Sequence, residues 1–255
     1  LRTVKLQNAE GQQFCGWVRV GHRPAENTLS VTVSESLLPV LPEVLARIKN
    51  LFDLYCEPEA VYETLQVMNT LQPGLCVLGT RLPGCFNVFE MSVRAVLGQQ
   101  ITVKAASTLA ARLVAVYGTQ VQTGIEGLTH SFPAPAAILA LGENISEHLG
   151  KLGIISARAN TIYQLARVLA DEKNDFGFCG NPEEEMQKLQ AIRGIGSWTA
   201  QYIAMRAMGW PDAFLPTDAG IKKALPDHTP KELQVLSEAW RPWRSYATVN
   251  LWNTL

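Results

Sequence analysis

Residues 1–35 alternate between apolar and polar positions. Residues 28–34 carry an apolar side chain at every second position, and a similar stretch contains Phe14, Trp17, Val18 and Val20. A period of two predicts strands of a sheet with one solvent-exposed face. Glycine, proline and asparagine in residues 21–27 predict the turn between these strands.

From Pro42 onward the apolar positions follow the period of an amphipathic helix. The i, i+3, i+4, i+7 spacing begins with Leu41, Val44, Leu45, Ile48, Leu51 and Phe52. The rest of the chain predicts further helices at 58–71, 86–98, 102–117, 155–171, 183–191, 197–209, 219–225, 230–239 and 244–254. We therefore expect an α+β protein, in which a small N-terminal unit precedes a mainly helical body.

Composition supports a folded protein. The 255 residues are 47% hydrophobic and 18% charged, which is enough apolar material for a sizeable core. The net charge of -1 argues against a protein that coats nucleic acid by bulk charge, but it allows a local grip on a few phosphates. No apolar run reaches the length of about 18 residues that a transmembrane helix needs. The first residues do not resemble a signal peptide, and because there is no initial Met we expect a piece of a longer chain.

The five cysteines are odd in number and widely spaced, with no C-x-x-C pair. This pattern predicts reduced thiols in a cytosolic protein, and it does not match the usual spacings of zinc or iron–sulfur ligands. The cysteines are Cys15, Cys56, Cys76, Cys85 and Cys179.

One helix–turn–helix segment carries candidate chemistry. Gly194 and Gly196 flank an apolar residue, and a second helix follows with Ser197, a favoured N-cap residue, at its start. The N–H groups at the start of that helix would point outward and form an anion site suited to a nucleic-acid phosphate. The alternative is an ordinary corner in which the glycines only let two helices pack.

Asp218 begins a short predicted helix downstream of this turn. On local grounds it is a helix cap. A carboxylate beside an apolar pocket can instead stabilise a positive charge that develops on a sugar ring, or align a water molecule.

Four segments together resemble a known family. They are residues 89–100 (FEMSVRAVLGQQ), 194–202 (GIGSWTAQY), 212–218 (DAFLPTD) and 240–247 (WRPWRSYA). Their order and spacing are similar to the 3-methyladenine DNA glycosylase II family, the alkylation-repair branch of the helix-hairpin-helix DNA glycosylases. The resemblance implies a small antiparallel-sheet domain at residues 1–55. It also implies a helical helix-hairpin-helix body at residues 56–255, with a base pocket between two lobes.

The resemblance implies hydrolysis of the N-glycosidic bond of a flipped, alkylated base of the 3-methyladenine or 7-methylguanine type. Asp218 corresponds to the essential carboxylate, which would stabilise an oxocarbenium-like sugar while water attacks. Trp198, Tyr202 and Trp252 correspond to the base-stacking aromatics, although their spacing also fits core residues. The DNA wedge falls at Gln100, with Ile101 beside it, where an apolar residue is expected.

The resemblance also assigns the hairpin. Gly194 and Gly196, with Ser197 and Thr199, would bind a DNA phosphate. Main-chain carbonyls of Gln190, Ile192 and Ile195 would hold a monovalent cation, Na⁺ or K⁺, and no other cofactor is expected.

Related enzymes that also cut the strand use a lysine in the second hairpin helix. Residues 197–209 contain no lysine, so we expect a monofunctional glycosylase. A different class of function is also open: a non-catalytic helix-hairpin-helix DNA-binding domain of a larger alkylation-response protein. In either case we expect a monomer that binds double-stranded DNA in the bacterial cytoplasm. Its basic residues should cluster on one face, namely Arg94, Lys104, Arg193, Arg206, Lys222, Lys223, Arg241 and Arg244.

Overall fold

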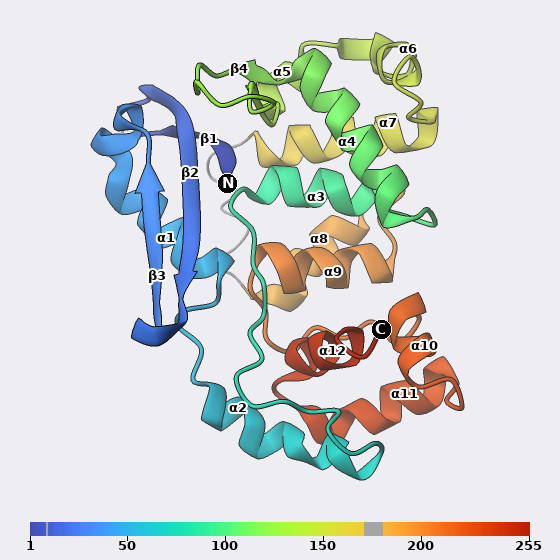
Figure 1. Ribbon diagram of the computed structural model, residues 1–255. Helices are drawn as coiled ribbons and strands as arrows, with labels where there is room; N and C mark the ends of the chain where they lie inside the picture. Colours follow the sequence, from blue (N-terminus) through green and yellow to red (C-terminus); the bar gives the residue numbers. More distant parts are fainter. Residues whose placement is uncertain (9, 171–180) are drawn as a thin grey trace.

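The N-terminal region is a three-stranded antiparallel sheet with one helix packed on it (Figure 1). The computed structural model describes residues 1–8, 10–170 and 181–255. The strands β1 (Arg2–Gln7), β2 (Gln13–Arg23) and β3 (Thr28–Val33) pair in the order β1-β2-β3. A 3-10 segment, η2 (Glu35–Val40), leads into α1 (Leu41–Leu51). Val44 and Ile48 of this helix share a buried core with the sheet residues Val4, Leu6 and Val18.

The turn between β2 and β3 is shorter than the sequence predicts. Gly21, His22 and Arg23 still pair with β3, so the turn is confined to residues 24–27, with the short η1 (Pro24–Glu26) inside it. Gly21 suggested a turn, but the pairing between β2 and β3 continues through this residue. A side chain at Gly21 would lie 2.9 Å from the Ser30 hydroxyl, so this glycine provides close packing between the strands.

The body has two further hydrophobic cores. The first core is formed by the helices from α3 through α9. Helices α3 and α9 lie side by side in its centre (Figure 1). Its helices are α3 (Val88–Leu97), α4 (Val103–Tyr117), α5 (Pro135–Leu139), α6 (Ile145–Gly150), α7 (Ser156–Leu169), α8 (Pro182–Gln190) and α9 (Ser197–Ala207). Two short strands, β4 (Thr119–Gln120) and β5 (His130–Ser131), and η4 (Gly142–Asn144) complete this lobe.

The second helical core is built around Trp240, which is almost completely buried and meets Phe214 edge-on at 5.7 Å. It comprises α2 (Pro58–Leu65), η3 (Gln66–Thr70), α10 (Ala219–Ala224), α11 (Pro230–Leu236), η5 (Ser237–Trp240) and α12 (Arg244–Trp252). The chain returns from η3 to α3 along residues 71–87 (Figure 1). Tyr202 and Trp210 pack against both helical cores, so α9 lies at the seam between them.

These observations confirm the α+β class: a small antiparallel sheet followed by a helical body. The domain boundary between residues 55 and 56 stays a prediction. No described helix is long and apolar enough to cross a membrane. The structure gives Cys15, Cys56, Cys76 and Cys85 as free thiols, and Cys179 lies outside the described residues.

Candidate active site

The predicted hairpin joins α8 to α9 through a tight turn. Gly194 has a φ of 96°, a left-handed conformation that favours glycine, and a side chain there would meet the Thr161 hydroxyl at 2.1 Å. The cap of α9 differs from the prediction. Ala200 N donates to Gly196 O at 3.0 Å, so Gly196 is the N-cap and Ser197 is already the first helical residue. The Ser197 side chain makes no capping hydrogen bond.

Gly196 leaves the start of α9 open. A Cβ built at this glycine would have nothing within 4 Å, and both Gly196 and Ser197 are exposed. A phosphate could therefore approach the first N–H groups of this 11-residue helix closely.

The side chain of Thr199 is not part of this open surface. Thr199 is only 3% exposed, and its hydroxyl accepts a hydrogen bond from Gln99 Nε2 at 2.9 Å. The assignment of Thr199 to the phosphate site stays a prediction, and it would depend on the main chain, because the side-chain hydroxyl is bound to the loop after α3.

Asp218 is both the N-cap of α10 and the meeting point of three helices. Its Oδ1 accepts from the main-chain N–H groups of Gly220 at 2.8 Å and Ile221 at 3.1 Å. The same oxygen accepts from Trp252 Nε1 at 2.8 Å, and Oδ2 accepts from Trp198 Nε1 at 3.0 Å. Asp218 is 9% exposed. Four N–H groups thus donate to one carboxylate.

Two of the three predicted aromatic residues, Trp198 and Trp252, bind this carboxylate, and the third, Tyr202, contacts both of their rings. Trp198 and Tyr202 lie one turn apart on α9 and stack with centroids 5.2 Å apart and planes 10° apart. Tyr202 and Trp252 are 6.4 Å apart and tilted by 47°. The Arg206 guanidinium lies 5.7 Å from the Tyr202 centroid. All three rings are half-buried, so they are not simply core residues.

An enclosed base pocket stays a prediction. Two open cavities in the described part of the chain lie elsewhere. One, of about 230 Å³, is lined mainly by β1 and residues 131–135, and the other, of about 300 Å³, lies within residues 120–129. Because Trp198 and Tyr202 are in contact face to face, a base would stack on an outer ring face and not between them.

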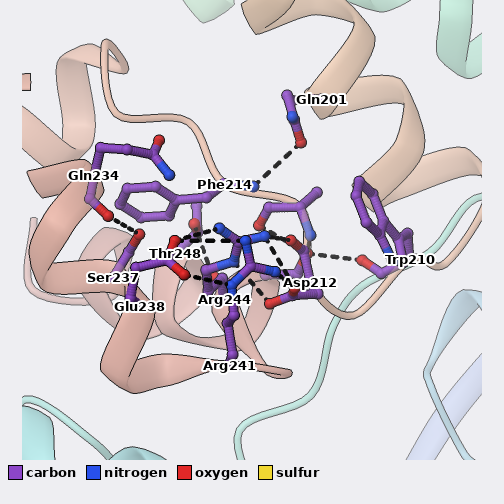
Figure 2. Close-up of polar contacts among 12 residues, drawn as sticks. Gln201, Trp210, Asp212, Phe214, Gln234, Ser237, Glu238, Arg241, Arg244 and Thr248 are labelled. Atoms are coloured by element: carbon purple, nitrogen blue, oxygen red, sulfur yellow. Dashed lines mark hydrogen bonds and ion pairs between the residues drawn. The ribbon is translucent and has the colours of Figure 1, made fainter. Parts of the chain in front are cut away.

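A buried ion pair holds the segment that delivers Asp218. Arg244 is 6% exposed, and its Nε and Nη2 donate to the two carboxylate oxygens of Asp212 at 2.7 and 2.9 Å (Figure 2). Arg241 donates to the same carboxylate. The Ser245 hydroxyl donates to Trp210 O at 2.7 Å, so the start of α12 fixes the chain just before Asp218.

This ion pair removes one residue, Arg244, from the predicted basic face. Arg244 is buried, and Arg241 pairs with Asp212 and Glu238. Arg94 pairs with Glu90, and Arg206 donates to Pro83 O and Tyr202 Oη. Of these four arginines only Arg244 is buried, because Asp212 lies within its reach, while Arg206 is half-buried. The exposed members of the predicted set are Arg94, Lys104, Arg193, Lys222, Lys223 and Arg241. Their clustering on one face stays a prediction.

The wedge position Gln100 is exposed at the tip of the loop between α3 and α4. Its φ of 54° is left-handed, which is uncommon for a residue other than glycine, while Ile101 beside it is half-buried. Of the predicted cation ligands, Gln190 is the last residue of α8, and Ile192 and Ile195 lie in the turn that follows. The carbonyls of Arg193 and Gly194 accept from Thr161 and Gln99, and Ile192 O accepts from Ile195 N at 3.0 Å.

Two family models match the chain. Residues 1–87 match the AlkA N-terminal domain, and residues 93–244 match the HhH-GPD superfamily of base excision DNA repair proteins. The chain belongs to the HhH-GPD superfamily. Its hairpin and Asp218 both lie within the matched region of this HhH-GPD chain.

Relatives and a solved structure agree with this assignment. The chain is 38% identical over 230 residues to DNA-3-methyladenine glycosylase 2 of Escherichia coli (strain K12), covering 90% of this chain and 78% of that protein. It is 40% identical over 216 residues to a probable bifunctional transcriptional activator/DNA repair enzyme AlkA of Mycobacterium tuberculosis, covering 82% of this chain but only 42% of that protein. A 3-methyladenine DNA-glycosylase from Archaeoglobus fulgidus shares the fold, with a TM-score of 0.72, 23% identity, and coverage of 98% of this chain and 84% of that one.

The structure adds residues that the sequence did not single out. Gly220 lets Trp252 approach Asp218, since a Cβ there would lie 2.7 Å from Trp252 Cδ1. Asp212 and Arg244 stand in two of the segments that carry the resemblance, but nothing in their spacing shows that they pair. Gln99 contacts the hairpin, although only its neighbour Gln100 was expected to act.

Proposed function

We propose that this chain is a DNA glycosylase that hydrolyses the N-glycosidic bond of alkylated bases, of the 3-methyladenine or 7-methylguanine type, in double-stranded DNA. The observation that carries the proposal is the Asp218 carboxylate held between the indole N–H groups of Trp198 and Trp252. Two of the proteins compared above, those of Escherichia coli and Archaeoglobus fulgidus, are named 3-methyladenine glycosylases. A non-catalytic DNA reader has no need of a carboxylate fixed among half-buried aromatic rings.

In the proposed reaction, the open start of α9 binds a phosphate of the damaged strand through Gly194, Gly196 and Ser197. Gln100, with Ile101, fills the gap that the flipped nucleotide leaves. Flipping costs a few kcal/mol of stacking and pairing, and it costs least at a weakened base pair. The outer faces of Trp198 and Trp252 then stack on the base, with Tyr202 supporting them, and electron-rich rings favour a cationic purine.

Asp218 supplies the chemistry in this proposal. As the bond to the base breaks, positive charge develops on the sugar, and a carboxylate fixed beforehand stabilises it without having to reorganise. Water completes the reaction. Residues 197–207 of α9 contain no lysine, so the proposal includes no Schiff-base intermediate and no strand cleavage.

The proposal includes no cofactor besides a monovalent cation in the hairpin. The carbonyls of Gln190, Ile192 and Ile195 flank the two turn carbonyls that side chains already use, and carbonyl oxygens suit a hard monovalent cation. Such an ion, Na⁺ or K⁺, would add positive charge near the phosphate. We further propose a monomer that acts on DNA in the bacterial cytoplasm.

Release of free bases from methylated duplex DNA tests the proposed function. Base release with intact strands supports a monofunctional glycosylase. DNA binding without release would favour the alternative, a non-catalytic DNA-binding domain of a larger alkylation-response protein. A borohydride-trapped protein–DNA adduct would contradict the use of water as nucleophile.

A further inference from the structure

The loop between α3 and α4 holds two adjacent glutamines that point in different directions. Gln100 is exposed, has a left-handed backbone conformation and occupies the predicted wedge position. Gln99 is half-buried and reaches away from this loop to the hairpin. The two residues therefore have separate roles, although they are identical in type.

The side-chain amide of Gln99 binds two acceptors of the hairpin. Its Nε2 donates to Gly194 O at 2.9 Å and to the Thr199 hydroxyl at 2.9 Å. A main-chain carbonyl can only accept, so the nitrogen end of the amide must face Gly194. One acceptor lies in the turn and the other in the first turn of α9, so Gln99 contacts both parts of the proposed phosphate site.

Helix α7 contacts both the wedge loop and the hairpin turn. Arg158 donates to the main-chain carbonyl of Gln99. Thr161, one turn later on the same helix, donates to Arg193 O at 2.9 Å. The wedge loop and the hairpin are thus tied directly to each other and also to one shared helix, although they are about 95 residues apart in the chain.

We propose that Gln99 is a positioning residue that couples the DNA wedge to the phosphate grip, so that Gln100 enters the duplex at a fixed distance from the bound phosphate. The inference rests on the proposed function. It predicts that Gln99 is needed when a stacked, paired base must be flipped out of duplex DNA. It predicts a much smaller need when the damaged base is already unpaired.

The variant Gln99→Glu tests this coupling. Glutamate has almost the same shape, but its carboxylate has no N–H to donate and would face the oxygen of Gly194. Single-turnover base release should be measured on one lesion, 7-methylguanine, placed either in a fully paired duplex or in a bulge. We expect release from the paired duplex to fall by about tenfold or more, and release from the bulge to change by less than about threefold.

Matched variants separate positioning from general damage to the fold. Gln122→Glu adds the same charge at an exposed side chain and should leave both rates unchanged. Thr199→Val removes one acceptor of Gln99 and should shift the paired-to-bulged ratio in the same direction, whereas Thr199→Ser keeps the hydroxyl and should restore it. The Thr199 pair decides the question if Gln99→Glu does not fold.

The possible outcomes differ clearly. If the unaltered protein releases no base from either substrate, the proposed function fails. If it does release base, but Gln99→Glu and Thr199→Val slow both substrates by the same factor, then Gln99 only supports the fold and the coupling is overturned. A selective loss on the paired duplex, with the melting temperature nearly unchanged, supports the coupling.

Discussion

At the scale of single residues, Asp218 combines two roles that local sequence rules keep apart. It caps α10 through the N–H groups of Gly220 and Ile221, as an N-terminal aspartate ordinarily does. It also accepts from two indole N–H groups that come from α9 and α12. The capping contacts fix the carboxylate, and the indoles fix the aromatic rings relative to it.

Gly220 is the residue that makes this arrangement possible. A Cβ there would lie 2.7 Å from Trp252 Cδ1 and 2.9 Å from its Nε1. We expect Gly220→Ala to displace Trp252 from Asp218 and to slow single-turnover base release by about tenfold, while helix propensity keeps the melting temperature nearly unchanged. Gly150→Ala, which adds a methyl group into open space in α6, is the control. An unchanged rate in Gly220→Ala would contradict the role given to Trp252.

Gly196 gives the opposite test, because space is open around it. Its φ of -86° suits any residue, so Gly196→Ala should fold normally. The new methyl group would stand where a phosphate approaches the start of α9. We expect the Kd for duplex DNA to rise by about tenfold at fixed salt, whatever the sequence, as measured by fluorescence anisotropy. Unchanged affinity would place the phosphate elsewhere.

At the scale of elements, the segment between α9 and α10 is positioned by the ion pair between Asp212 and Arg244 (Figure 2). Arg244→Met leaves the buried Asp212 with only Arg241, and losing one partner of a buried pair costs about 3–5 kcal/mol. Urea denaturation should show this loss. Arg241→Met, at a side chain that is 47% exposed, should cost much less, about 0–1 kcal/mol. Equal losses in the two variants would contradict this difference.

The elements that the sequence predicts best are those with a long apolar period. Helices such as α4 and α7 repeat their apolar face over several turns, so period alone predicts them. The short α5 and α6 were not predicted, since five or six residues give too little periodicity. The cap of α9 was placed one residue too late because Ser197 is a better N-cap by type than Gly196.

At the scale of the whole molecule, residues distant in the chain form the candidate site. Trp198, Asp218 and Trp252 come from three helices at the seam of two cores, and no local pattern shows that they meet. Their grouping was expected only from the family resemblance. The Asp212–Arg244 ion pair likewise depends on tertiary contacts, which is why Arg244, expected on a DNA-facing surface, is buried.

The junction between the sheet and the helical body gives a test of stability against pH. Burial raises the pKa of the Cys85 thiol to about 11, above its ordinary value of about 8.5. The unfolded chain therefore loses this proton first as the pH rises, and the folded state loses stability from about pH 8.5 upward until the folded thiol also ionises near pH 11. Denaturation of Cys85→Ala across this range should show a shallower decline than the unaltered protein. Parallel declines would contradict the buried, neutral thiol.

The central claim is that the Asp218 carboxylate stabilises the charged sugar. Asp218→Asn tests it most directly, because asparagine keeps an oxygen that can cap α10 while removing the charge. Single-turnover release of 7-methylguanine from duplex DNA should fall by about 10²–10³ or more, with the Kd for DNA nearly unchanged. Release within a few-fold of the unaltered rate, in a variant that folds and binds DNA, would contradict the claim.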